Sequence, residues 1–399
     1  MEALNLKIVL ILTVGFALAS ILGYLSHRIK LSPILGYLIA GYLIGPYSPG
    51  YVADRQIAEQ LAEIGIILMM FSVGLQFKWQ DLARYKRTAV PGALVQTFFA
   101  LIVSAALVYS IGWSLEAGII FGLSIGVAST VVLARILADN ALLNTPAGHL
   151  SVGWLIVEDI ITVAALLILS PLASSYNGEG FSLKSVALAF LFALVKFAAL
   201  NWVMFTWGKR LVSYLLSKVV LTNSHELFTL TILALTFVVA AGSALLLGTS
   251  IALGAFVAGM VMGQTRIRFQ ISMNALPLKE AFVVVFFLSV GMLFDPYTVV
   301  EHPLLSLAVL AIILIVKPLA AFSITLILRN PLKTAFVTAL ALAQIGEFSF
   351  ILAERATTLG VLPRAGYDII IACSLISISI NPLLFKLLKT FSFLEKPLH

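Results

Sequence analysis

Long apolar segments, separated by short polar or Pro- and Gly-rich stretches, recur along the whole chain of 399 residues. A helix needs about 20 residues, each rising about 1.5 Å, to cross the hydrocarbon core of a bilayer. Dividing the chain at these polar, Pro- and Gly-rich stretches gives thirteen such segments, of which the second and ninth are conspicuously short. We therefore predict an all-α polytopic membrane protein with thirteen transmembrane helices. The predicted spans are Leu6–Leu25, Pro33–Gly45, Ile57–Phe77, Ala89–Ile111, Leu115–Leu137, Ala147–Ala173, Leu183–Trp207, Glu226–Leu247, Ser250–Gly263, Pro277–Phe294, Pro303–Leu328, Leu332–Ala353 and Ala365–Leu388.

Composition excludes several classes of function. Apolar residues make up 61% of the chain and charged residues only 11%, a balance outside the range of soluble globular domains. The single cysteine, Cys373, excludes a disulfide framework and argues against a metal-thiolate site. The net charge of +7 comes from basic residues in short loops rather than on one amphipathic face, so no nucleic-acid partner is expected. We predict neither an enzymatic activity nor a cofactor.

The distribution of basic residues predicts the orientation in the membrane. Five of the 25 lysines and arginines fall in loops on the side of the N-terminus, two lie within spans, and eighteen fall on the other side. By the positive-inside rule the N-terminus is outside and the C-terminus cytoplasmic, which requires an odd number of spans. We expect a multi-pass protein of the bacterial inner (plasma) membrane. The five residues are Lys7, Arg55, Lys184, Arg355 and Arg364.

The sequence contains an internal repeat. Close helix packing accounts for small residues at intervals of four, but not for their matched order in two places. The copies are displaced by seven helices, an odd number, so the second enters the bilayer from the opposite face. We predict two inverted six-helix repeats, residues 5–174 and 226–390, joined by linker helix 7 at 183–218. Residues Glu63, Ser72, Val73, Gly74 and Phe77 recur 217 positions later as Glu280, Ser289, Val290, Gly291 and Phe294; Gly36, Ala40, Gly41 and Gly45 recur 218 positions later as Gly254, Ala258, Gly259 and Gly263.

Two spans are predicted to be interrupted. The offset of 217 places Gly126–Thr130 of helix 5 opposite Ala343–Glu347 of helix 12, and both stretches carry helix-poor or polar residues midway along a span. Inverted repeats of this kind hold their substrate at the midplane, where broken helices expose backbone groups. We therefore predict crossed broken helices 5 and 12. The alternative is two continuous helices that tolerate Gly and Ser.

The carboxylates Glu158 and Asp159 lie in the middle of the sixth span. A charge at that depth costs about 2.5 to 3.5 kcal/mol and usually has a function. Neighbours on a helix point about 100° apart, so we predict that Asp159 binds the ion or proton while Glu158 pairs with another group. The predicted charge partner is Lys317, which precedes Pro318 in the eleventh span. A purely structural ion pair between Glu158 and Lys317 is the alternative.

Further polar residues complete the predicted site. Hydroxyls of Ser129 and Thr130 supply the oxygen ligands that Na⁺ or K⁺ prefers, whereas a divalent metal would want more carboxylates or histidines. Gln344, Gly346 and Glu347 belong to the crossing helix 12. For Glu347, neutralisation of a helix dipole or ion access competes with a packing role. We interpret Glu63 and Glu280 as solvated residues near helix ends and give Lys196 no role in transport.

Four stretches carry a resemblance to a known family: Gly36–Pro46, Leu61–Leu75, Gly153–Asp159 and Gln344–Phe348. With them the chain resembles the second family of monovalent cation:proton antiporters, especially Kef-type potassium efflux systems and their YbaL-like relatives. The resemblance implies a homodimer with a static interface domain and a mobile core that works by elevator-type alternating access. It also implies that Asp159 is the essential carboxylate and Lys317 the core lysine.

The chain departs from the family pattern in two ways. Sodium-exchanging relatives commonly carry Asp-Asp or Asn-Asp at the pair and Kef systems Gln-Asp, whereas this chain has Glu158-Asp159. The ion, K⁺ or Na⁺, and the electrical stoichiometry therefore stay open. Kef-like members usually continue into a cytosolic nucleotide-binding regulatory domain, which we expect to be missing here after His399. A ligand-gated K⁺ efflux channel, a sodium-coupled organic solute symporter and an intramembrane aspartyl protease are the competing hypotheses.

Overall fold

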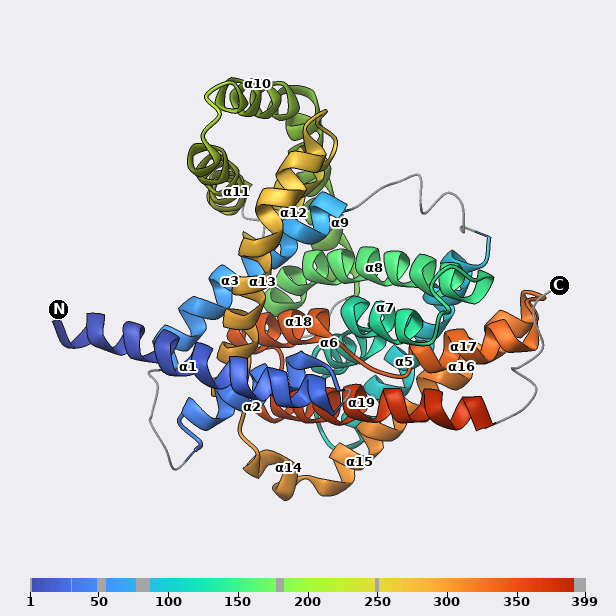
Figure 1. Cartoon of the computed structure of the whole chain (residues 1–399). Coiled ribbons are helices and arrows are strands. Elements are labelled where there is room, and N and C mark those ends of the chain that lie inside the picture. Colours follow the sequence, from blue (N-terminus) through green and yellow to red (C-terminus); the bar gives the residue numbers. More distant parts are fainter. Residues whose placement is uncertain are drawn as a thin grey trace.

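The computed structural model describes residues 2–29, 31–48, 55–76, 87–176, 183–247 and 251–390, and every regular element in these ranges is helical (Figure 1). Within these described residues, seven helices are long and apolar enough to cross a membrane, or eight if the bent helix α13 counts as one span. In chain order the helices are α1 (Glu2–Arg28), α2 (Pro33–Ile44), α3 (Arg55–Gln76), α5 (Ala89–Ser110), α6 (Leu115–Gly126), α7 (Thr130–Asp139), α8 (Pro146–Tyr176), α9 (Leu183–Val203), α10 (Lys209–Val220), α11 (His225–Leu247), α12 (Ile251–Gly263), α13 (Arg268–Leu293), α14 (Tyr297–Glu301), α15 (Pro303–Ala311), α16 (Lys317–Ile327), α17 (Leu332–Ala341), α18 (Glu347–Thr358) and α19 (Arg364–Thr390).

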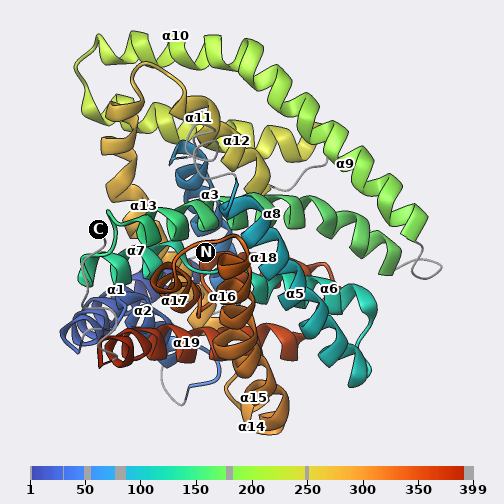
Figure 2. The same ribbon diagram turned by 90° about the vertical axis from the view of Figure 1, so that its right-hand side faces the viewer.

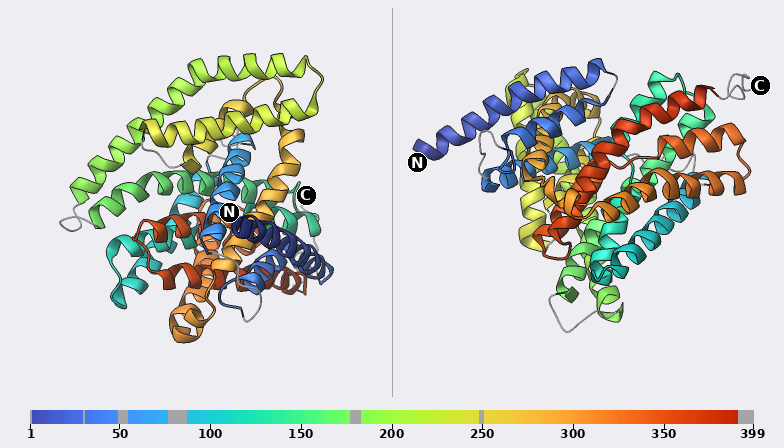
Figure 3. Two further views of the ribbon diagram at one scale, coloured as in Figure 1. Left: turned by 90° about the vertical axis from the view of Figure 1, so that its left-hand side faces the viewer. Right: turned by 90° about the horizontal axis from the view of Figure 1, so that it is seen from below.

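The helices pack as two bundles. Bundle 1 contains α1, α2, α3, α11, α12 and α13, and bundle 2 contains α5 to α8 and α15 to α19. The view from below in Figure 3 shows the two groups side by side. The arm formed by α9, a π-helical turn and α10 runs along the edge of the molecule from bundle 2 to bundle 1 (Figure 2). The predicted linker at 183–218 corresponds to this arm, although the helix continues two residues further.

Small residues allow the helices of bundle 1 to touch. A Cβ added to Gly74 of α3 would overlap the carbonyl oxygen of Phe256 in α12. The related Gly291 of α13 lies in the same way against the carbonyl oxygen of Leu38 in α2. The order of small residues noted in the sequence therefore marks two close helix crossings, because only glycine lets the backbones approach this far.

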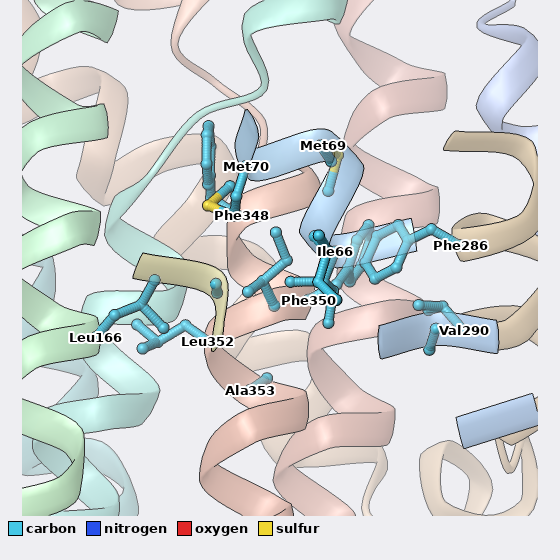
Figure 4. Packing of buried hydrophobic residues seen from close by; sticks show 14 of the residues in the cluster. Ile66, Met69, Met70, Leu166, Phe286, Val290, Phe348, Phe350, Leu352 and Ala353 are labelled. Atoms are coloured by element: carbon cyan, nitrogen blue, oxygen red, sulfur yellow. The ribbon is translucent and has the colours of Figure 1, made fainter. Parts of the chain in front are cut away.

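An apolar seam separates the two bundles. The ring of Phe287 in α13 packs edge-on against Phe350 in α18, with centroids 6.0 Å apart and planes at 90°. Dispersion and burial at such a seam are non-directional, so these apolar contacts impose no fixed hydrogen-bonded register between the two bundles. Figure 4 shows side chains at this seam: Ile66, Met69 and Met70 of α3, Phe286 and Val290 of α13, Leu166 of α8, and Phe348, Phe350, Leu352 and Ala353 of α18.

One predicted boundary was wrong. The sequence suggested that the tenth span begins at Pro277, but α13 begins at Arg268 and carries Pro277 in its interior. The segments Arg268–Ala275 and Glu280–Leu293 meet at 47°. Proline lacks an amide donor and its ring clashes with the preceding turn, so inside a helix it produces a bend. Here the residue marks a kink rather than a start.

Candidate ion-binding site

Two spans are interrupted where the sequence suggested. The first gap lies between α6, which ends at Gly126, and α7, which begins at Thr130. The second lies between α17, which ends at Ala341, and α18, which begins at Glu347. Glu347 therefore occupies the first turn of α18, where a carboxylate meets the positive end of the helix dipole. This position agrees with the dipole role considered for Glu347.

Hydrogen bonds hold the two interruptions against each other. The amide of Gln344 accepts from Ser129 N at 2.9 Å and donates to the Ser129 carbonyl at 3.1 Å. Ser129 Oγ donates to Glu347 Oε2 at 2.8 Å and accepts from Val132 N at 3.2 Å, which caps α7. A Cβ at Gly346 would overlap the Cα and Cβ of Ser129. Glycine at position 346 is therefore a condition of the crossing.

Glu158 and Asp159 have different surroundings. Glu158 is fully buried, and its Oε2 accepts a hydrogen bond from Ala128 N at 2.7 Å in the first interruption. Asp159 is half-buried, and its Oδ1 has no hydrogen-bond partner among the described residues. The charges that act on it come from Glu158 and Glu347. One carboxylate thus supports the unwound backbone, and the other remains available in a negative field.

Lys317 reaches the same region from α16. Its side chain is fully buried, and Nζ donates to the backbone carbonyl of Gln344 at 3.1 Å. The charges of Lys317 and Glu158 act on each other, although no ion pair closer than 4 Å joins them in the described part of the chain. A π-helical turn, Ile312–Val316, directly precedes Lys317 and Pro318. This wider turn accommodates the proline ring and helps to orient the lysine.

Thr130 begins α7, and its hydroxyl lies unpaired among the described residues. This orphan oxygen, Asp159 Oδ1 and Glu158 Oε1 are the three atoms of the predicted site that lack a hydrogen-bond partner among the described residues. Buried polar atoms without partners are rare and require an explanation such as an ion or a water. Ser129, by contrast, already makes the hydrogen bonds described above.

Two residues of the site were missed from the sequence. Gln96 of α5 donates to the carbonyl of Gly126 at 3.0 Å and accepts from Trp154 Nε1 at 2.9 Å. Asn381 of α19 donates to the carbonyl of Leu340 at 2.7 Å. Both are uncharged amides within apolar spans, so polarity at that depth was the signal available for them.

The structure also places the charged residues set aside earlier. Glu63 of α3 is exposed and lies 3.7 Å from Arg355 of α18, so this ion pair joins the two bundles. Glu280 is exposed and lies where the second segment of α13 begins after the bend. Lys196 lies over the ring of Phe192, one turn earlier on α9, at 5.8 Å. None of the three lies among the residues that hold the interruptions.

The transmembrane family of sodium/hydrogen exchangers matches residues 16–388. The chain belongs to this family. It is 44% identical to the putative cation/proton antiporter YbaL of Escherichia coli (strain K12) over 377 residues. This alignment covers 94% of the present chain and 68% of YbaL. It is 28% identical to the glutathione-regulated potassium-efflux system protein KefC of Cronobacter sakazakii, over 93% of this chain and 58% of KefC.

The fold has a solved counterpart. The sodium proton antiporter MjNhaP1 from Methanocaldococcus jannaschii superimposes with a TM-score of 0.72 at 16% identity, over 99% of this chain and 100% of that chain. The match shows a shared fold. As a sodium/hydrogen exchanger family member, the chain is a multi-pass membrane protein and a cation/proton antiporter rather than an enzyme, and the resemblance to Kef-type and YbaL-like antiporters is confirmed.

Proposed function

We propose that the chain exchanges a monovalent cation, K⁺ or Na⁺, for protons and that Asp159 carries both in turn. The observation that carries this proposal is the unpaired Oδ1 of Asp159 beside two interrupted helices. Glu158 Oε2 accepts from Ala128 N and Glu347 Oε2 accepts from Ser129 Oγ, so both of these carboxylates hold the interruptions although Glu158 Oε1 has no partner among the described residues. Asp159 makes no hydrogen bond in the described part of the chain, which favours it as the carboxylate that takes a ligand from outside the protein.

Competition between the two ions follows from charge. A carboxylate in a poorly solvated site is stable when a proton or a cation neutralises it. Both use the same oxygen atoms, so binding of one displaces the other. The free hydroxyl of Thr130 supplies a neutral oxygen for a dehydrated cation. The Ser129 hydroxyl is already bound to Glu347 and its backbone to Gln344. Ser129 therefore supports the site by holding the two interrupted helices together.

The proposed movement is of elevator type, with bundle 2 sliding against bundle 1. The apolar seam and the arm that links the bundles support it. We propose that the eight long spans of the described residues, α2, α12, the arm and the two interrupted pairs together make up the thirteen spans expected from the sequence. We propose that these form two inverted repeats in the bacterial inner membrane, with an outside N-terminus and a cytoplasmic C-terminus.

The proposed partners are the exchanged cation and proton, membrane lipid and a second copy of the chain. Names of relatives point to different ions, sodium for MjNhaP1 and potassium for KefC. Proton flux after separate additions of K⁺, Na⁺ and Li⁺ to reconstituted vesicles identifies the ion. The same assay with the membrane voltage clamped by an ionophore separates electroneutral from electrogenic exchange, since moved charge is worth about 2.3 kcal/mol per 100 mV.

The decisive variant is Asp159→Asn. Because Asp159 Oδ1 makes no hydrogen bond in the described part of the chain, the isosteric change should leave the thermal unfolding temperature nearly unaltered. We expect cation-driven proton flux to fall to the level of empty vesicles. A variant that exchanges at the wild-type rate would rule out this site. Unitary currents in the wild type would instead support a channel, and solute-dependent sodium uptake would support a symporter.

A further inference from the structure

Two adjoining cavities lie along the arm. The first has a volume of about 420 Å³ and lies between α8, α12 and the end of α9. Its wall is mostly apolar and includes Ile160, the neighbour of Asp159 in the sequence. The second is a groove of about 690 Å³ at the start of α10. Phe205 lines both, so the cavity and the groove adjoin at that residue.

The groove has a different chemistry from the cavity. It combines two cations, Lys209 and Arg210, with the hydroxyls of Thr206 and Ser213. Neither cation has a carboxylate partner in the described ranges of the chain. Two adjacent unpaired positive charges beside hydroxyl donors match an anion with several oxygen atoms.

A π-helical turn builds the boundary between the two compartments. Met204–Gly208 forms this turn, whose hydrogen bonds join residues five apart. Trp202 and Trp207 are also five residues apart, and their ring centroids lie 6.4 Å from each other. Both rings are exposed. Tryptophan favours the level where hydrocarbon meets lipid headgroups, which predicts that the groove lies at headgroup depth and the cavity deeper in the bilayer.

A molecule that fits both the cationic groove and the adjoining apolar cavity has an anionic head and an apolar tail. A free phosphate would leave the cavity unfilled, and a zwitterionic lipid such as phosphatidylcholine would bring its own ammonium group close to Lys209 and Arg210. The positive-inside rule places Lys209 and Arg210 on the cytoplasmic side, where anionic lipids meet basic residues.

We propose that the arm binds one anionic phospholipid, with its phosphate at Lys209 and Arg210 and an acyl chain in the cavity beside Ile160. The binding itself does not depend on the exchange activity. Because the cavity borders α8 of bundle 2 and α12 of bundle 1, the acyl chain would lie where the bundles move against each other. If the proposed function holds, this lipid also tunes the exchange rate.

The test uses thermal unfolding of the purified full chain in neutral detergent with added phosphatidylglycerol, phosphatidylcholine or inorganic phosphate. We expect phosphatidylglycerol to raise the unfolding temperature by roughly 3 °C at saturation, and the other two additives to have less than half that effect. The double variant Lys209→Gln/Arg210→Gln should lose most of the shift. The control variant Lys218→Gln/Arg266→Gln removes the same charge from exposed positions outside both cavities. It should keep the full shift in unfolding temperature with phosphatidylglycerol.

A second variant tests the tail. Val163→Phe narrows the apolar cavity without touching the cations and should also reduce the shift with phosphatidylglycerol. Native mass spectrometry should retain one phosphatidylglycerol per wild-type chain and none on the double variant. An unchanged shift in Lys209→Gln/Arg210→Gln, equal loss in the control, or an equal shift with phosphate or phosphatidylcholine would overturn the proposal. Activity of Asp159→Asn does not enter this readout, so the two proposals fail independently.

Discussion

Gln344 holds both backbone groups of Ser129, accepting from its N–H and donating to its carbonyl. The amide thus replaces, with one side chain, two of the hydrogen bonds that a continuous helix would have made. Because both residues are buried, these groups have no access to water when the contact is lost.

Replacement of Gln344 by Leu should therefore be costly. Two buried backbone groups lose their partner, at a cost of about 1 to 3 kcal/mol each. The unfolding temperature in detergent should therefore fall by several degrees, and the exchange rate should fall at least tenfold. Ser349→Ala is the control, since it removes a single long contact of 3.5 Å to the Val127 carbonyl. Equal effects of the two variants would show that the Gln344 contact is not special.

Gly346→Ala should disrupt the crossing. An added Cβ meets the Cα and Cβ of Ser129, and neither backbone can move without breaking the Gln344 contacts. We expect a loss of about 1 to 3 kcal/mol in stability, measured as reduced folded yield and unfolding temperature. Gly242→Ala in α11 is the matched change, because nothing lies within 4 Å of its Cβ. It should be neutral or slightly stabilising.

Glu158 and Lys317 should be energetically coupled despite the absence of a direct contact. Lys317→Met leaves a buried carboxylate without its positive neighbour, and Glu158→Gln leaves a buried ammonium. Removal of one partner of a buried pair costs about 3 to 5 kcal/mol. In a double-mutant cycle of thermal unfolding, the stability lost by the double variant should be about 1 to 3 kcal/mol smaller than the sum of the two single losses. Strict additivity would mean that the two charges do not support each other.

Cross-linking the bundles should stop transport. Glu63→Cys/Arg355→Cys places thiols on α3 and α18 where an ion pair now joins the bundles. A short bis-maleimide should block exchange in this variant, because sliding requires the two helices to separate. The native Cys373 is buried and should not react. Leu227→Cys/Thr231→Cys, one turn apart on α11, should cross-link without loss of exchange; full activity in the cross-linked first variant would contradict a moving bundle.

The interruptions and the midspan charges were accessible from the sequence because each is a local departure from an apolar helix. Gly126–Thr130 and Ala343–Glu347 stand out against their neighbours, and the structure breaks both helices there. Pro277 was misplaced for a related reason, since proline suits both a helix start and a kink and only packing selects between them. Gln96 was not found because an uncharged amide is a weaker local signal than a carboxylate.

The sequence by itself determined that the chain spans a bilayer and that carboxylates lie midway along a span, because segment length and charge are properties of consecutive residues. Only the tertiary structure decided which carboxylate is engaged. Glu158 and Asp159 are adjacent and chemically alike, and the rotation of α8 within its bundle aims the first at Ala128 N and leaves Oδ1 of the second without a partner in the described part of the chain. That rotation depends on contacts with helices far away in the sequence, which no local pattern records.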